Sequence, residues 1–460
     1  MKVTNIRLGF ATNSSSSHSV ILGGGPRSHG DIAYAGDLEY GWDYFTLNDA
    51  GEKASYLAVA VWDSIPGPEW QKMAVMEEIF RGTPIPNAFR SMTERSSWSH
   101  PYIDHQSAFT LPGVDSPNFP SLVKEALEFF TDSRLSIYGG NDNDSQEIPG
   151  NMVFGDYGRV RIRRDGDNYT IFNWDAGAKV RLANGEWEKS EKPELVDLKI
   201  TNRCPYRCSF CYQGSIPDGD EPDLWKITPY IEAIGINGVG AFEVAIGGGE
   251  PTSHPDFAAI IHACLDNFVK PNFTTFAVDW LLDKKKVEAA RLCGGIGVSV
   301  HSKRDLDKVR KISSQTGSFN VVAQHVYGTL SVKDTLDLLS SAEGMHILLL
   351  GYKTTGFGAS QKPHDMEGLP QQIRSCSIPK NTRLSVDTAM VNLHPDLLEK
   401  LKAEKIMYTA REGAFSMYLD AASGCMGMSS YDPDSMVAIT GEKPSCGQIT
   451  AMIMENYPKW

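Results

Sequence analysis

The spacing of hydrophobic residues divides the chain into two parts near residue 195. In the first part, apolar residues recur at helical spacing in the segments 54–65, 68–80 and 121–130. Other segments read as strands separated by turn residues: 160–164, 169–174 and 179–182. The first part is therefore predicted to be a mixed α+β domain that ends in an antiparallel meander.

After residue 195, strand-like and helix-like segments alternate, which is typical of a parallel sheet with helical crossovers. The expected strands are 195–201, 242–247, 272–277, 296–301, 319–326 and 345–351. The expected helices are 228–236, 255–268, 282–292, 303–315, 331–342 and 366–374. These units predict an α/β fold, a partial (βα)6 barrel. Two further strands (382–388 and 414–420), a helix between them (395–404) and a turn-rich tail from Gly424 are expected to extend its wall.

Length and composition narrow the class of protein. A chain of 460 residues is too long for one hydrophobic core, and its 41% hydrophobic and 22% charged residues are ordinary for a globular protein. No apolar run approaches the roughly 18 residues of a membrane helix, and the first 25 residues lack the apolar segment of a secretory signal. Eight cysteines, three of them close together, favour a reducing cytoplasm over a disulfide framework.

We expect four regions along the chain. A flexible polar arm covers 1–30, and an α+β N-terminal domain of unknown role covers 31–190. The barrel covers 191–380, and a short C-terminal extension, 381–460, completes it.

The net charge of −13 disfavours direct binding to duplex nucleic acid, because an acidic surface repels a phosphate backbone. A local exception is the basic strand that contains Arg159, Arg161 and Arg163 on one face. We expect this face to be solvated on an edge hairpin.

Three cysteines in one short loop are the strongest chemical signal. Cys204, Cys208 and Cys211 follow the strand at 195–201 directly. A structural zinc site takes four ligands, usually from two cysteine pairs, whereas three thiolates on a four-iron cluster leave one iron open. An open position on a metal is where chemistry occurs.

A glycine-rich turn follows the next strand of the barrel. Gly247, Gly248 and Gly249 let the backbone approach a ligand closely, and Glu250 can accept hydrogen bonds from an ammonium group. Ligands bind at the carboxyl ends of barrel strands, and both segments are predicted to lie there.

The two segments together resemble the radical SAM superfamily, whose loop is C-x3-C-x2-C with an aromatic residue, here Phe210, before the last cysteine. The resemblance covers roughly residues 194–375 and implies a TIM-like partial barrel. It implies that the three cysteines bind a [4Fe–4S] cluster and that the open iron binds S-adenosylmethionine. Reduction would cleave this cofactor to a 5′-deoxyadenosyl radical. A flavodoxin- or ferredoxin-like electron donor is implied as well.

The resemblance also assigns cofactor contacts. Gly248, Gly249 and Glu250 are expected beside the methionyl amino group, and Ser299 near the ribose hydroxyls. The alternative for Ser299 is a side chain packed in a barrel layer.

Other polar residues are candidates for contact with the substrate. Lys353, at the end of the sixth strand, is a candidate for an anionic substrate group, and Cys425 is a candidate thiol hydrogen donor. The alternatives are a solvated lysine and an inert thiol. Asp197 and Lys199 are predicted to face the barrel interior, where they must pair with each other or with ligand.

Three positions are left open by the sequence. Asp387 and Tyr418 are further inward candidates for moving a proton or hydrogen atom. Of Gln324 and His325, only one can face the interior, because neighbours on a strand point to opposite sides.

The sequence therefore predicts a radical SAM enzyme that abstracts hydrogen from a nucleotide, modified base or small metabolite. One alternative is a peptide- or protein-modifying enzyme of the same superfamily. Another is a non-catalytic iron–sulfur or zinc scaffold. The segment from Arg7 to Ser17 also resembles a leader of some bacteriophage-encoded proteins, so a phage source is a further hypothesis.

Overall fold

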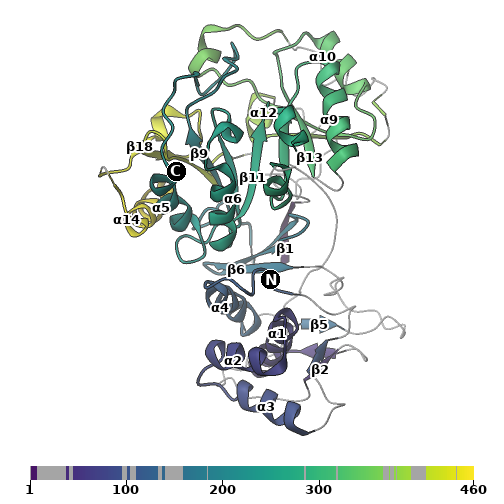
Figure 1. Cartoon of the computed structure of the whole chain (residues 1–460), viewed down its shortest axis with the longest axis vertical. Helices are drawn as coiled ribbons and strands as arrows, with labels where there is room; N and C mark the ends of the chain where they lie inside the picture. The colour runs from purple at the N-terminus through teal and green to yellow at the C-terminus, as the bar shows by residue number, and fades with distance from the viewer. Residues whose placement is uncertain are drawn as a thin grey trace. The chain divides into compact units, whose positions relative to one another are not determined.

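The computed structural model divides into two compact units (Figure 1). The first comprises Met1–Leu8 and Ser15–Trp187, and the second comprises Gly9–Ser14 and Glu188–Trp460. The residues that the structure describes are 2–7, 38–40, 45–95, 101–103, 110–132, 137–139, 159–183, 185–283, 286–316, 320–365, 372, 378–379, 381–394, 411–441 and 443–460.

Helices form much of the first unit. They are α1 (Ala50–Ser64), α2 (Glu69–Ile79), α3 (Ile85–Arg95) and α4 (Phe119–Phe130). The side chain of Asp49 starts α1 by accepting hydrogen bonds from the first-turn backbone, completed by Glu52 as a capping box. The helix predicted to begin at Pro68 begins one residue later, at Glu69, and Pro68 is its N-cap.

The predicted meander is confirmed and gains a fourth strand. β6 (Val160–Asp165), β7 (Asn168–Asn173) and β8 (Lys179–Ala183) pair antiparallel, and β1 (Lys2–Arg7) adds to β8. The sequence predicted a flexible arm over 1–30; Lys2–Arg7 instead form this strand, and the rest of the arm and most of the phage-like segment lie outside the described residues. Four short strands complete the unit: β2 (Glu39–Tyr40), β3 (Phe45–Leu47), β4 (Tyr102–Ile103) and β5 (Ile137–Gly139).

The expectation of a solvated arginine face on β6 is wrong for two of its three residues. Arg159 is exposed, but Arg161 and Arg163 are buried. The guanidinium of Arg161 lies 3.1 Å from a carboxylate oxygen of Glu125 on α4, so a long-range ion pair offsets its desolvation.

A ten-stranded sheet forms the second unit, and eight of its strands run parallel as the predicted barrel wall. Its strands are β9 (Leu195–Thr201), β10 (Glu243–Gly248), β11 (Lys270–Thr275), β12 (Ile296–Ser299), β13 (Val321–Val326), β14 (His346–Leu350), β15 (Arg383–Val386), β16 (Ser416–Asp420), β17 (Cys425–Gly427) and β18 (Val437–Ala438). The order is β15-β14-β13-β12-β11-β10-β9-β16-β17-β18. The two strands predicted as a wall extension, β15 and β16, are the ends of the parallel run.

Helices cover the outer face of this wall (Figure 1). They are α5 (Leu224–Ile234), α6 (Phe257–Asp266), α7 (Val278–Leu282), α8 (Val287–Arg291), α9 (Lys303–Thr316), α10 (Val332–Ser340), α12 (Thr388–Leu393) and α14 (Cys446–Asn456). Short 3-10 turns are η1 (Pro251–Ser253), η2 (Gly356–Ser360), η4 (Pro433–Ser435) and η5 (Tyr457–Lys459). The predicted helix at 395–404 and nearly all of that at 366–374 lie outside the described residues.

The tail from Gly424, which was predicted to be turn-rich, contains two strands and a helix among its described residues. Its helix α14 packs beside α5 and buries Ile449 and Ile453 (Figure 1). Ser445 and Gln448 form a capping box at its start, a signal present in the sequence. Within the described residues, no helix is both long and apolar enough to cross a bilayer.

Alternation along the strands separates a helix face from an interior face. Val196, Leu198 and Ile200 of β9 belong to the core beneath the helices, so Asp197 and Lys199 face the interior, as predicted. On β13 the helix-facing residue Ala323 and the 3.2 Å hydrogen bond from Thr274 Oγ1 to Gln324 Oε1 place Gln324 on the interior face. His325 therefore lies on the helix side, where its Nδ1 is 3.0 Å from the carbonyl oxygen of Val300.

Candidate cofactor and substrate site

The cysteine loop folds against itself directly after β9. The Cys204 amide donates to Ile216 O at 2.8 Å, and the Cys211 amide donates to Cys208 O at 3.0 Å. Arg207 adopts a positive φ of 50°, which turns the chain between the first two cysteines. All three thiols are free and partly exposed. The loop therefore presents its cysteines without a disulfide.

The three thiols are close enough to influence one another. Burial raises the pKa of Cys204 and of Cys208, and the Cys211 thiol adds to the rise for both. Three neighbouring thiolates need a positive charge to hold them together, and a bound metal supplies it. This donor set fits an iron–sulfur cluster.

Among the described residues, no three or more His, Cys, Asp or Glu side chains converge as a single metal ion requires. The thiolates of an iron–sulfur cluster bind different irons, which is a separate geometry.

The glycine turn after β10 docks on the cysteine loop through its backbone. Gly248 has a φ of 115°, and a Cβ there would collide with the carbonyl oxygen of Thr201. A Cβ on Gly249 would collide with the carbonyl oxygen of Arg203. The amides of Gly249 and Glu250 donate to these same two oxygens at 2.8 and 2.9 Å. The two sequence motifs therefore form one backbone-bonded surface that only glycine permits.

The Glu250 side chain is 2% exposed and holds the turn to β11. Its Oε1 accepts from Thr252 N at 3.2 Å, Thr252 Oγ1 at 2.5 Å and Thr275 Oγ1 at 2.6 Å. Its Oε2 accepts from Phe276 N at 3.0 Å and keeps further acceptor capacity. The expected contact with an ammonium stays a prediction, and no sequence pattern indicated this anchoring role.

Aromatic rings from three loops gather beside the cysteines. The ring centroid of Phe210 lies 5.0 Å from that of His301, and Phe276 lies 5.5 Å from His301 and 4.8 Å from Tyr206. Ser299, at the end of β12, is partly exposed two residues before His301, and its predicted ribose contact stays a prediction. The Nδ1 atom of His301 is buried without a hydrogen bond in the described part of the chain. His301 closes the predicted strand 296–301, and the sequence did not suggest its aromatic neighbours.

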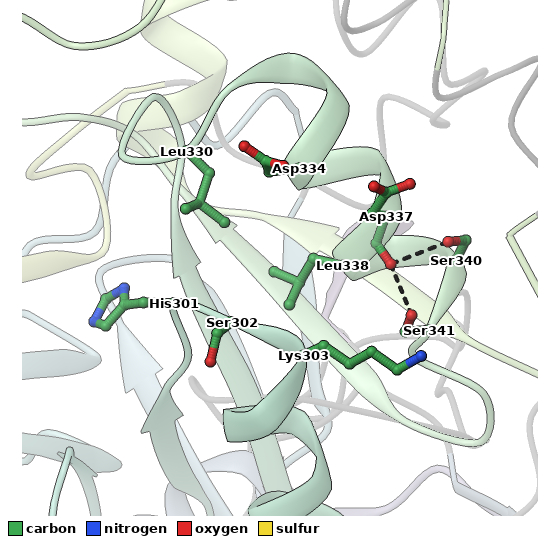
Figure 2. Close-up of a pocket in the computed structure, with 9 residues that line it drawn as sticks. All are labelled: His301, Ser302, Lys303, Leu330, Asp334, Asp337, Leu338, Ser340 and Ser341. Carbon is green, nitrogen blue, oxygen red and sulfur yellow. Dashed lines mark hydrogen bonds between the residues drawn. The ribbon is translucent and has the colours of Figure 1, made fainter.

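His301 also lines a groove of about 550 Å³ between the start of α9 and α10. Figure 2 shows the groove extending from His301, past Lys303, to Asp334 and Asp337 on α10. The Asp337 carbonyl oxygen accepts from Ser340 and Ser341, which closes the far end of α10. The groove thus belongs to the helix layer.

A polar group surrounds Lys353 beyond β14. The Lys353 ammonium lies 4.4 Å from the ring centroids of both Tyr212 and Tyr431. Burial lowers the pKa of Lys353, but Tyr212, Asp387, Asp197 and Glu412 outweigh burial and raise it. The predicted alternative of a solvated lysine does not match this environment. Of this group, the sequence pointed to Asp197 and Asp387 and missed the rest.

Lys199 pairs with a residue that the sequence did not suggest. Its ammonium lies 3.3 Å from Asp420 Oδ2, which also accepts from the Tyr418 hydroxyl at 3.1 Å. The expected pairing of Lys199 with Asp197 is therefore wrong, and a contact of either residue with a ligand stays a prediction. Burial raises the pKa of Cys425, whose sulfur lies 3.5 Å from Ser423 Oγ; its charged neighbours are Asp420 and Lys199. Lys353 and Cys425 thus lie in different polar groups.

Comparisons with known proteins show which family part of the chain resembles. Residues 198–326 match the family model of the Radical SAM superfamily. An 86-residue segment is 31% identical to the PqqA peptide cyclase of Methylorubrum extorquens strains, which is 19% of this chain. The match spans about a fifth (22%) of that relative's length.

Solved structures with similar folds include Streptococcus suis SuiB bound to S-adenosylmethionine, with 17% identity, a TM-score of 0.42, and coverage of 53% of this chain and 62% of SuiB. SuiB bound to the precursor peptide SuiA gives 18% identity, a TM-score of 0.42, and coverage of 56% and 63%. Native anSMEcpe with AdoMet and the Cp18Cys peptide gives 11% identity, a TM-score of 0.39, and coverage of 57% and 80%.

Members of the matched superfamily bind a [4Fe–4S] cluster and S-adenosylmethionine. The cysteine loop and the glycine turn are its two motifs, and both lie at carboxyl ends of neighbouring parallel strands. The segment 198–326 therefore carries a domain of the radical SAM superfamily.

Proposed function

We propose that the chain is a radical SAM enzyme that removes a hydrogen atom from a peptide or protein substrate. The observation that carries the enzyme assignment is the docking of the glycine turn on the cysteine loop through the carbonyl oxygens of Thr201 and Arg203. A scaffold that only stored iron would not need a glycine-lined surface beside the open side of the loop. When bound, the cluster and S-adenosylmethionine supply a carbon radical that abstracts hydrogen.

Each part of the site has a proposed task. Cys204, Cys208 and Cys211 hold the cluster, and the turn of Gly248, Gly249 and Glu250 positions the methionyl group. Phe210 and Ser299 border the rest of the cofactor. Lys353 and Cys425 remain candidates for contact with the substrate or its radical. A flavodoxin- or ferredoxin-like protein is the proposed electron donor.

The peptide substrate is supported by the PqqA peptide cyclase, to which an 86-residue segment of this chain is 31% identical. The sequence alone favoured a nucleotide, modified base or small metabolite, and no relative named above acts on one by its name. We therefore prefer the peptide alternative.

The test of the enzyme is cofactor turnover. Anaerobically reconstituted protein with dithionite and S-adenosylmethionine is expected to release 5′-deoxyadenosine. Cys208→Ala should abolish the product, whereas Cys446→Ala, a partly buried cysteine on α14, should retain it. A protein with a verified four-iron cluster that yields no 5′-deoxyadenosine would overturn the enzyme assignment in favour of the scaffold.

A further inference from the structure

The interior face of the barrel carries a polar group that the cofactor does not account for. We define the lumen cluster as Asp197, Tyr212, Lys353, Asp387, Glu412 and Tyr431. Asp197 lies on β9, Lys353 follows β14, Asp387 follows β15 and Glu412 precedes β16. The cluster therefore joins the two ends of the parallel run of strands.

Two carboxylates of the lumen cluster have partners within the protein. Asp387 Oδ1 accepts from Gly351 N at 2.9 Å and from Met390 N at 2.7 Å. Glu412 Oε1 accepts from the Tyr431 hydroxyl at 2.6 Å. These bonds fix both side chains and leave Asp197 as the remaining acid.

The side chain of Asp197 has no hydrogen bond or ion pair among the described residues. Its side chain is accessible to water, yet protein surrounds it deeply enough that burial raises its pKa to about 6. Alternation along β9 places this side chain on the interior face of the sheet, because Val196 and Leu198 face the helices. Asp197 thus presents an unused carboxylate to the barrel interior.

Lys353 does not neutralise Asp197 by direct contact. Its ammonium lies 4.4 Å from the ring centroids of both Tyr212 and Tyr431, with no ion pair within 4 Å in the described part of the chain. Cation–π contacts from two sides hold the ammonium where it is. The lumen cluster then carries three carboxylates against one ammonium.

This excess of negative charge favours a ligand that brings a positive charge into the lumen cluster. The nearby pair of Lys199 and Asp420 is already neutral, so it does not offset the excess. An anionic ligand group at Lys353 would face Asp197, Asp387 and Glu412 at the same time. The net charge of −13 also favours the approach of cations over anions.

We infer that the lumen cluster binds a positively charged group of the substrate, an ammonium or guanidinium such as a lysine or arginine side chain, with Asp197 as its direct partner. This inference rests on the proposed function and names the substrate class of that site. Lys353 limits the space for the cation to the Asp197 side, because like charges repel. The earlier expectation that Lys353 meets an anionic group is the competing hypothesis.

The test is binding, measured without reductant so that turnover does not interfere. Reconstituted protein with bound S-adenosylmethionine is titrated calorimetrically with N-acetyl-glycyl-X-glycinamide, where X is lysine, arginine, citrulline or glutamate. We expect the lysine and arginine peptides to bind about tenfold more tightly than the citrulline peptide, since a charged hydrogen bond replaces a neutral one. Equal binding of all four, or no binding, would overturn the inference.

Variants assign the effect to the lumen cluster. Asp197→Asn keeps the shape of the side chain and should erase the preference for lysine over citrulline, while Asp307→Asn, on the outer helix α9, should leave it unchanged. Lys353→Gln should strengthen binding of the lysine peptide by removing a repelling charge. Preferential binding of the glutamate peptide that Lys353→Gln abolishes would instead establish the anionic hypothesis.

The outcome is separable from that of the proposed function. Release of 5′-deoxyadenosine by a protein that does not discriminate the peptides would refute the cation site and leave the enzyme standing. Discrimination without cofactor cleavage would support the cation site and refute the enzyme. Melting curves of each variant exclude loss of binding through unfolding.

Discussion

The buried carboxylate of Glu250 gives the sharpest test of the glycine-turn geometry. In Glu250→Gln, the amide oxygen can accept from Thr252 N, Thr252 Oγ1 and Thr275 Oγ1 as Oε1 does now. The amide NH2 group then faces Phe276 N, where two donors meet and neither is satisfied. The side chain is 2% exposed, so water cannot take over the lost bond.

The magnitude follows from the two buried donors that lack an acceptor, the backbone N–H of Phe276 and the new amide NH2 group. Leaving such a group unpaired costs about 1–3 kcal/mol, and the loss of charge from the remaining bonds adds to the cost. The assay is urea unfolding of Glu250→Gln followed by circular dichroism. Glu288→Gln is the matched control, because its side chain is 70% exposed and its pair with Arg291 should contribute less than about 1 kcal/mol. Equal unfolding free energies of the two variants would refute the hydrogen bonds assigned to Glu250.

Three further variants probe the same unit. Lys199→Met removes the positive charge beside the buried carboxylate of Asp420 and should lower the unfolding free energy by about 3–5 kcal/mol, measured by urea unfolding. The control Lys459→Met, on the surface, should lower it by less than about 1 kcal/mol in the same assay. Asp197 binds its proton more tightly in the folded chain than in the unfolded chain, so stability falls as pH rises from about 4 to about 6. Asp197→Asn should therefore raise the melting temperature at pH 8 and not at pH 4. An unchanged dependence of melting temperature on pH would contradict the raised pKa. Gly248→Ala should lower both the bound iron and the affinity for S-adenosylmethionine, because Gly248 has a positive φ and an added Cβ would collide with the carbonyl oxygen of Thr201. The control Gly447→Ala should lower neither, because the space around Gly447 is open. Normal iron content in Gly248→Ala would contradict the docking of the two loops.

Local patterns were enough to predict much of the barrel. Alternation placed Asp197 and Lys199 on the interior face of β9, and the cysteine and glycine segments were placed at neighbouring strand ends before any pairing was known. The strand 272–277 was predicted two residues late because Pro271 reads as a strand breaker, yet Pro271 lies within β11, opposite Val244. The helix α14 was missed although its Ser445–Gln448 capping box was visible, since glycine and polar residues obscured its apolar spacing.

Pairings between distant strands were beyond the reach of sequence patterns. Lys199 meets Asp420, and Arg161 meets Glu125, because tertiary packing brings strands and helices together at positions that no spacing encodes. The same holds for the anchoring of Glu250 by Thr275 and Phe276 from the next strand end. A charged residue predicted to be buried implies that a partner exists, but the identity of that partner depends on how the strands and helices pack together.

The cofactor site is formed by residues close together in the sequence, whereas the lumen cluster is formed by residues far apart in it, and this difference indicates which site determines the choice of substrate. The cofactor residues lie in two consecutive loops whose backbones bond to each other, so a short stretch of chain determines them. The lumen cluster instead draws Asp197, Lys353 and Glu412 from the first strand, the sixth strand and the segment before β16. Substitutions at these positions alter the charge of the barrel interior, and the link from Lys353 to the cysteine loop is a contact with the ring of Tyr212, the residue after Cys211. A change of substrate is therefore expected to appear at the lumen cluster while the cofactor loops stay constant.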